Sequence, residues 1–120
     1  MSRDTRRQAE QRGQWGERVA TWLLRLKGYR ILAHQNRGPM GEIDLIAARG
    51  NTLIFVEVKS RPTYEQALEA VNPTQRGRIQ RAAEHYVATH PATHNMAWRF
   101  DIVAVMPRKW PRHLVDAWRP

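Results

Sequence analysis

The segment GEIDLIAARGNTLIFVEVKS, residues 41–60, decides the fold that this chain can adopt. It contains two largely apolar runs, residues 42–48 and 53–59, on either side of Gly50-Asn51. A glycine-asparagine pair between two such runs is typical of a two-residue hairpin turn. The segment therefore predicts two antiparallel strands that are joined by a tight turn.

Counting outward from this turn brings acidic residues of the two strands together. Asp44 lies opposite Glu57, and Glu42 lies opposite Lys59, all on one face of the hairpin. Directly opposed side chains have Cβ atoms about 5 Å apart, so the like charges at 44 and 57 repel each other. Partial burial makes this repulsion more costly. The other face is entirely apolar and is expected to be packed; it carries Ile43, Leu45, Ala47, Ile54, Val56 and Val58.

A divalent cation between Asp44 and Glu57 would remove this repulsion. Two carboxylates, waters and a phosphate oxygen are suitable ligands for Mg²⁺ or Mn²⁺. Such an ion polarises a phosphodiester and lowers the pKa of a bound water. Lys59 follows Glu57 by two residues on the same face, where it can position that water or stabilise developing charge. The hairpin is thus a candidate nuclease site.

The same residues also fit a purely structural interpretation. In that case Glu42 and Lys59 form a surface ion pair, and Asp44 accepts hydrogen bonds from the backbone. In the catalytic interpretation Glu42 instead supports the metal ligands from outside their immediate shell. Short patterns of an aspartate followed by Glu-x-Lys also arise by chance, so the spacing alone leaves both interpretations open.

Further helices and strands are predicted on both sides of the hairpin. Apolar residues recur at helical spacing in two segments, and the second begins at Asn72-Pro73, a typical cap followed by a proline at the first helical position. The expected helices span residues 14–27 and 72–90, the other strands 29–33, 98–106 and 114–118, with a loop at 37–41 and an irregular or weakly helical segment at 60–72. This order indicates an α/β fold with a central mixed β-sheet flanked by α-helices.

The composition limits the class of protein. The 120 residues, 42% of them hydrophobic, are expected to form one domain, residues 13–120, preceded by a flexible basic arm, residues 1–12. Cysteine is absent, which excludes disulfides, thiolate zinc sites and a cysteine nucleophile. The N-terminus does not resemble a secretory signal, and no apolar run approaches the ~20 residues of a membrane span, so a cytoplasmic protein is expected.

The charge balance favours a polyanionic partner. Twenty basic and eleven acidic residues give a net charge of +9, and the pI is about 11.2. All but Lys27, Lys59 and Lys109 of the basic residues are arginines. Guanidinium groups bind phosphate through two parallel hydrogen bonds, so an arginine-rich surface suits a nucleic-acid backbone.

Several motifs resemble the YraN-like family of uncharacterised proteins. They are GEIDLIA at residues 41–47, FVEVKSR at 55–61, Gly16-Glu17 on the first expected helix, and RFDIVA at 99–104. The resemblance covers residues 13–106 or so, nearly the whole chain. It implies membership of the endonuclease-like PD-(D/E)xK superfamily, a similarity to archaeal Holliday-junction resolvases, and a restriction-endonuclease-like sheet.

The resemblance also implies roles for individual residues. Asp44 and Glu57 match the superfamily's metal ligands, and Lys59 matches its catalytic lysine. Glu17 matches an acidic residue that the first helix of resolvase-like members adds to the metal site. The implied cofactor is Mg²⁺ or Mn²⁺, the implied substrate is DNA, and a homodimer is expected because resolvases act as symmetric dimers on branched DNA.

The candidate phosphate contacts lie outside the hairpin turn. They are Arg37, Arg61, Gln75, Arg76, Arg78 and Arg81. Gln75 departs from the family pattern, which usually has a lysine in the segment leading into the second long helix. A glutamine can still donate a hydrogen bond to phosphate but brings no charge, and Arg76 and Arg78 are candidates to compensate.

Two other functions remain open from the sequence. The chain could be a nucleic-acid-binding module that keeps the fold without turnover, for which Gln75 is the best support. It could also be a basic structural adaptor that binds a protein or ribosomal RNA. Of the remaining residues, Asp101 is expected to orient a neighbouring arginine, and Trp15, Trp22 and Trp98 are expected in the core. Trp110 and Trp118 could stack bases among Arg108, Lys109, Arg112 and Arg119, but burial with a C-terminal strand is favoured.

Overall fold

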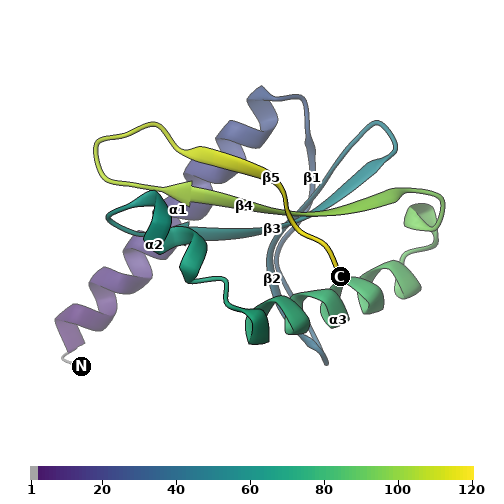
Figure 1. Ribbon diagram of the computed structural model, residues 1–120, viewed down its shortest axis with the longest axis horizontal. Helices are drawn as coiled ribbons and strands as arrows, with labels where there is room; N and C mark the ends of the chain where they lie inside the picture. The colour runs from purple at the N-terminus through teal and green to yellow at the C-terminus, as the bar shows by residue number, and fades with distance from the viewer. Residues whose placement is uncertain (1–2) are drawn as a thin grey trace.

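A five-stranded sheet forms the centre of the computed structural model, which describes residues 3–120 without the side chains of residues 3–6 and 9 (Figure 1). The elements in chain order are α1 (Arg3–Leu26), β1 (Arg30–Gly38), β2 (Gly41–Arg49), β3 (Thr52–Ser60), α2 (Tyr64–Glu69), α3 (Pro73–Thr89), a 3-10 turn (Pro91–Thr93), β4 (Ala97–Val105) and β5 (Arg112–Trp118). The strands lie side by side in chain order, and only β3 and β4 are parallel. The expected mixed sheet flanked by helices is therefore confirmed.

The parallel pair requires a crossover, which α2 and α3 provide. Both helices begin at side-chain caps. Thr63 Oγ1 accepts a hydrogen bond from the Gln66 amide at 3.2 Å, and Asn72 Oδ1 accepts one from the Gln75 amide at 2.9 Å. Asn72 thus confirms the helix start predicted from the sequence.

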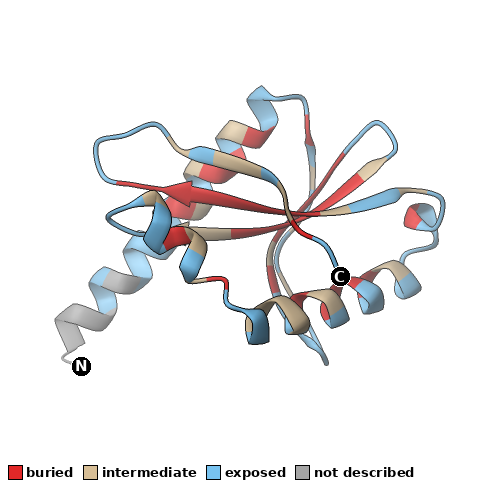
Figure 2. Cartoon of the chain, viewed as in Figure 1, coloured by how far each residue is buried: buried red, intermediate tan, exposed pale blue. Residues whose placement is uncertain are grey.

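Apolar side chains cover both faces of the sheet, which explains the continuous apolar runs of β2, β3 and β4. In Figure 2 the buried residues follow these central strands between the two long helices. The cluster on the α1 side contains Ala20, Leu24, Tyr29, Leu45, Ala47, Ile54, Val56, Val103 and Val105. The cluster on the α3 side includes Ile43, Ile46, Phe55, Ile79, Ala83, Tyr86, Phe100, Ile102 and Trp118.

Helix α1 begins at Arg3 rather than at residue 14, so residues 3–12 are helical where the sequence predicts a loose arm. This stretch contains arginine, glutamine, alanine and glutamate and is free of proline, and those residues favour a helix. Strand β1 likewise continues to Gly38, and only Pro39 and Met40 remain of the loop expected at residues 37–41.

Trp15, Trp22 and Trp98 are exposed by 62%, 48% and 40%, so the prediction that they belong to the core is wrong. The expected burial is also wrong for Trp110, which is 80% exposed, and is confirmed for Trp118, which is 7% exposed. Helix α1 contacts the sheet through Gly16, Ala20 and Leu24 instead. Gly16 lies so close to β3 that a Cβ there would overlap Ser60 Oγ. Because this close approach sets the rotation of the helix, the apolar side chains that recur at helical spacing in residues 14–27 face partly outward.

No helix in the described part of the chain is long and apolar enough to cross a membrane.

Candidate functional site

Strands β2 and β3 separate at Asp44 and Glu57. Their pairing confirms the predicted hairpin register from Arg49 opposite Thr52 as far as Leu45 opposite Val56. Beyond that pair each strand follows its other neighbour, β2 along β1 and β3 along β4. We call this point of divergence, with Asp44 and Glu57 on its two sides, the fork.

Side-chain carboxylates replace the backbone ladder at the fork. The Val58 amide donates a hydrogen bond to Asp44 Oδ2 at 2.8 Å, and the Asp44 amide donates one to Glu57 Oε2 at 3.3 Å. The Asp44 carboxylate is therefore bonded to the backbone of β3, and it does not project from one face of the sheet as the hairpin register predicts. Next to it the alternation of β2 changes, and Ile43 packs in the α3 cluster instead of beside Leu45 as the sequence predicts.

Burial makes ionisation of both acids unfavourable. Glu57 is 3% exposed, and its burial, together with the nearby charge of Asp44, raises its pKa to about 8 although Lys59 opposes the shift. Burial also raises the pKa of Asp44, against the hydrogen bond from Val58 and the charge of Lys59. The fork thus holds two neighbouring acids whose joint ionisation needs additional positive charge.

Lys59 and Gln75 complete the surroundings of this pair. Lys59 is half-buried, and its charge lowers the pKa values of both acids. Gln75 Nε2 donates a hydrogen bond to Glu57 Oε1 at 3.3 Å, from the first turn of α3. Gln75 therefore contacts one of the two carboxylates directly, whereas the sequence predicts it as a phosphate contact.

Glu17 lies beside the fork on α1, but Gln35 occupies its carboxylate. Gln35 Nε2 donates to Glu17 Oε1 and Oε2 at 3.2 and 3.1 Å. Burial raises the pKa of Glu17 against this hydrogen bond, and the charges of Asp44 and Glu42 raise it further. Glu17, Asp44 and Glu42 are therefore close enough to affect one another electrostatically.

Sequence reasoning missed Gln35. It lies within β1 and has a positive φ of 45°, which the sequence does not signal.

The described residues contain no group of three or more acidic or histidine side chains arranged to hold a metal ion. The fork nevertheless suits one kind of cation. Mg²⁺ keeps several waters and is commonly bound through one or two carboxylates together with substrate phosphates. Asp44 Oδ1 accepts no hydrogen bond from any described residue, so one carboxylate oxygen of the pair is available for such an ion.

Glu42 forms an ion pair with Arg37 rather than with Lys59. Arg37 Nε lies 3.4 Å from Glu42 Oε2, and both side chains are exposed. The structural interpretation is therefore right that Asp44 accepts a backbone hydrogen bond but wrong about the partner of Glu42. Among the described residues, Lys59 forms no ion pair.

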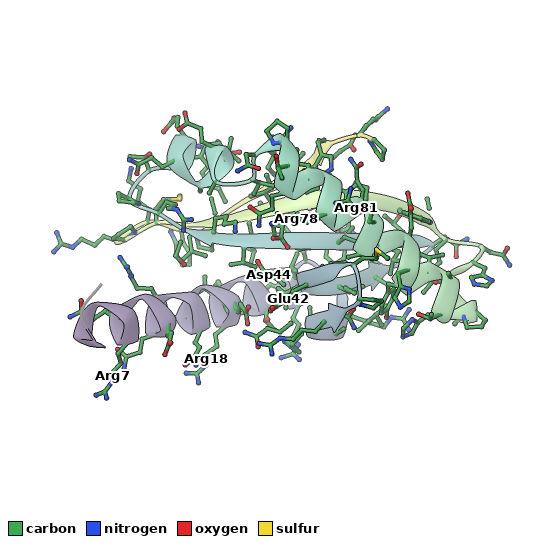
Figure 3. All side chains as sticks on the ribbon, turned by 90° about the horizontal axis from the view of Figure 1, so that it is seen from below. Arg7, Arg18, Glu42, Asp44, Arg78 and Arg81 are labelled. Atoms are coloured by element: carbon green, nitrogen blue, oxygen red, sulfur yellow. The ribbon has the colours of Figure 1, made fainter. Side chains whose placement is uncertain are left out.

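The predicted phosphate-binding arginines have different environments. Arg76 Nε donates to the Val71 carbonyl at 2.9 Å, and its guanidinium lies 5.4 Å from the Trp118 ring centroid, so Arg76 helps to hold α3. Arg78 and Arg81 are exposed on α3. In Figure 3 they lie on one side of Asp44 and Glu42, with α1 on the other.

Arg61 donates to the Ser60 carbonyl directly after β3.

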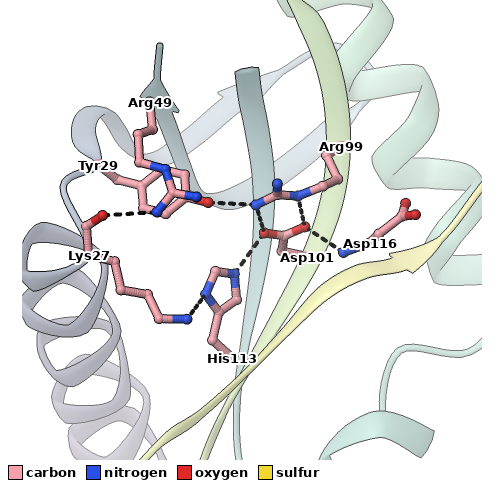
Figure 4. Close-up of polar contacts among 7 residues, drawn as sticks. All are labelled: Lys27, Tyr29, Arg49, Arg99, Asp101, His113 and Asp116. Atoms are coloured by element: carbon pink, nitrogen blue, oxygen red, sulfur yellow. Dashed lines mark hydrogen bonds and ion pairs between the residues drawn. The ribbon is translucent and has the colours of Figure 1, made fainter. Parts of the chain in front are cut away.

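Asp101 orients a neighbouring arginine, as the sequence predicts (Figure 4). Arg99 donates two hydrogen bonds of 2.8 Å to it, and the Asp116 amide donates one of 2.9 Å. His113 Nε2 lies 2.7 Å from Asp101 Oδ2, while Lys27 Nζ lies 2.8 Å from Nδ1 of the same ring. Because an ammonium only donates, Nδ1 is the acceptor and Nε2 carries the proton given to Asp101.

Comparison with known proteins identifies a family to which this chain is similar. A model described as uncharacterised protein family UPF0102 matches residues 16–105. A UPF0102 protein of Maricaulis maris is 50% identical over 115 residues, which cover 96% of this chain and 91% of the relative. A UPF0102 protein of Sinorhizobium medicae is 46% identical over 116 residues, which cover 97% of this chain and 95% of that relative. These descriptions name no activity.

Proposed function

Since this chain belongs to the uncharacterised protein family UPF0102, we propose its function from the fork: a metal-dependent nuclease that hydrolyses phosphodiester bonds, with branched or structured DNA as its substrate. The proposal places the chain in the PD-(D/E)xK superfamily, near the archaeal Holliday-junction resolvases. It also includes a cytoplasmic location and a homodimer, which suits a branched substrate.

The observation that carries the proposal is the pair Asp44 and Glu57. Both acids are held at the point where two strands diverge, and burial raises the pKa of each. Their described hydrogen-bond donors are backbone amides and a side-chain amide, none of which carries a charge. Carboxylates with raised pKa values and no ion-paired counter-ion among the described residues favour a functional site over a structural one.

A divalent cation would lie between these acids, with Asp44 and Glu57 as its ligands. When bound there, it would supply Lewis acidity toward a phosphate oxygen and toward an attacking water. Lys59 would orient that water and stabilise the negative charge that develops on the phosphoryl oxygens. Glu17 would join the site through water or after release from Gln35, which holds both of its oxygens.

Positively charged side chains on both sides of the fork would hold the substrate backbone. Arg78 and Arg81 are exposed on α3, and Arg61 follows the end of β3. Arg37 would have to exchange Glu42 for phosphate, an exchange that costs little because the ion pair is exposed. These arginines would supply the salt-dependent part of the affinity.

A second candidate is a binding module of the same fold that does not cleave. Gln75 favours it, because this neutral residue contacts Glu57 directly at a position where the resembling family usually has lysine. Without a cation from the protein at this point, the acids depend more strongly on a bound metal ion. The binding module and the nuclease therefore differ in turnover and not in the DNA contacts.

The test is cleavage of a labelled four-way junction and of single-stranded DNA with Mg²⁺ or Mn²⁺, with EDTA as the metal-free control. We expect cleavage only with metal, and we expect Asp44→Asn and Lys59→Gln each to lower the rate about 10³-fold while binding persists. Glu42→Gln is the matched control, since Glu42 is exposed and paired with Arg37. Binding without cleavage under every metal condition would favour the module, and equal cleavage by Asp44→Asn would refute the nuclease site.

A further inference from the structure

An aromatic groove lies along α1 on the side of the sheet opposite α3. Its volume is about 660 Å³, and it is lined by parts of α1, the end of β3 and the loop between β4 and β5. We define the aromatic groove by Trp15, Trp22 and Trp110, with Arg12, Arg18 and Arg61 at its rim. None of these tryptophans contributes to the two large apolar clusters of the core.

The tryptophan rings of the groove remain available to a ligand. Trp15 is 62% exposed, Trp22 is 48% exposed and Trp110 is 80% exposed. The rings of Trp22 and Trp110 are nearly parallel, at 14°, with centroids 6.2 Å apart. This offset stack holds the β4–β5 loop against α1 while leaving much of the Trp110 ring open to solvent.

The charge of the groove favours an anionic occupant. Five cationic residues line it, and no acidic residue is among the described lining residues. The two further cations, Arg108 and Lys109, precede Trp110 in the β4–β5 loop. An interface between two copies across a two-fold axis would bring these cations against themselves, which is unfavourable.

We propose that the aromatic groove binds unpaired nucleotides, with bases stacked on Trp15, Trp22 and Trp110 and phosphates on the rim arginines. Stacking on aromatic faces combined with a basic groove is the general mode of single-strand binding. In a duplex the base faces are covered by neighbouring base pairs and cannot reach the rings. The groove therefore selects single-stranded segments over continuous duplex.

The groove adjoins the fork, so this inference deepens the proposed function and rests on it for the link to cleavage. Arg18 lines the groove and also a hollow of about 250 Å³ that contains Glu17 and Gln35. A strand that leaves the groove past Arg18 would approach the fork from the side of Glu17, which would place the cut near a junction of single and double strand.

The test measures binding in EDTA, where cleavage cannot contribute. Titration of the full chain with a single-stranded thymine oligonucleotide, a blunt duplex and inorganic polyphosphate is followed by tryptophan fluorescence and, for the variants, by a fluorescent label on the nucleic acid. We expect Trp22→Ala and Trp110→Ala each to weaken single-strand binding about tenfold and to leave polyphosphate binding unchanged. Arg61→Ala should lower the salt dependence of single-strand binding by about one ion.

Trp98→Ala is the matched control, because Trp98 is 40% exposed at the start of β4 and lies outside the groove; we expect it to bind like the wild type. Unchanged single-strand affinity in both groove variants would overturn the proposal, even if the protein cleaves DNA. So would dissociation of a dimer by Trp110→Ala with unchanged affinity. Tryptophan-dependent single-strand binding by a protein that never cleaves would support the groove and refute only the nuclease.

Discussion

Glu57 and Asp101 are buried acids on neighbouring parallel strands, with Asp101 paired to Val56 directly beside Glu57. Their surroundings differ in charge. Burial alone would raise the pKa of Asp101, but hydrogen bonds from His113, Arg99 and the Asp116 amide outweigh it and hold the pKa below its ordinary value. Glu57 has only amide donors and a second acid nearby, and its pKa is raised to about 8.

The difference separates Asp101, which the fold compensates, from Glu57, which belongs to the proposed site. Asp101 is compensated within the protein and connects β4 to β5 and, through Arg99, to the Tyr29 hydroxyl at 2.6 Å. The pair at the fork is compensated only in part, by Lys59. Buried acids whose ionised forms the fold compensates only in part are the basis of the proposed cation site.

The largest expected effect is on stability at the Asp101 site. Asp101→Asn should lower the free energy of unfolding by about 3–5 kcal/mol, because it leaves the partly buried Arg99 without its counter-ion. Asp44→Asn is the matched change at the fork and should lower it by less than about 1 kcal/mol, since the amide oxygen can still accept from Val58. Urea unfolding at neutral pH measures both, and similar losses would mean that Asp44 is also structural.

The second effect is a pH dependence at the fork. The pKa of Glu57 is raised from 4.5 to about 8, so folding takes up a proton between these values, and the stability linked to that proton is present below pH 4.5 and lost as the pH rises through 8. Glu57→Gln should therefore match the wild type near pH 4.5 and exceed it by about 2–4 kcal/mol near pH 9. Urea unfolding across this pH range measures how far the stabilities of the variant and the wild type diverge. A variant less stable than the wild type at pH 9 would contradict the prediction.

The third effect is stabilisation by a divalent cation. Mg²⁺ at ten times its dissociation constant should stabilise the folded protein by about 1.4 kcal/mol. The gain should be larger at pH 8 than at pH 6, because protonation of Glu57 competes with the ion. Thermal unfolding with and without Mg²⁺ measures it; Asp44→Asn should lose the gain, whereas Glu42→Gln should keep it. An equal gain in Asp44→Asn would place the ion elsewhere.

The smallest effect is expected from restoring a charge beside Glu57. Gln75→Lys places an ammonium where Nε2 now lies 3.3 Å from Glu57 Oε1. It should lower the pKa of Glu57 and add roughly 0.5–1 kcal/mol of stability at pH 8. Gln80→Lys, farther along α3, is the control and should add nothing. Unfolding at pH 8 compares them, and an equal gain in both would show only a general effect of charge on the helix.

Most of the fold could be predicted from the sequence because its signals are local. The turn at Gly50-Asn51 set the register of β2 and β3, and Asn72 marked the start of α3. The helical character of residues 3–12 and the length of β1 were missed, since polar residues there follow no clear apolar period.

The site was predictable only in part. The juxtaposition of Asp44 and Glu57 followed from the period of two in the hairpin, which needs no tertiary information. The contact between Gln75 and Glu57 joins α3 to β3, and the contact between Gln35 and Glu17 joins β1 to α1. No local pattern signals contacts between elements that are distant in the sequence.

By itself the sequence determined the hairpin, the meeting of two acids beside a lysine, and a strongly basic chain without cysteine. Only the tertiary structure decided which buried acid is neutralised and which tryptophans are exposed. Asp101 meets His113 from β5, and the close contact of Gly16 with β3 turns Trp15 and Trp22 toward solvent. The physical reason is that turns and alternation depend on neighbouring residues, whereas burial and charge compensation depend on what packing brings from elsewhere in the chain.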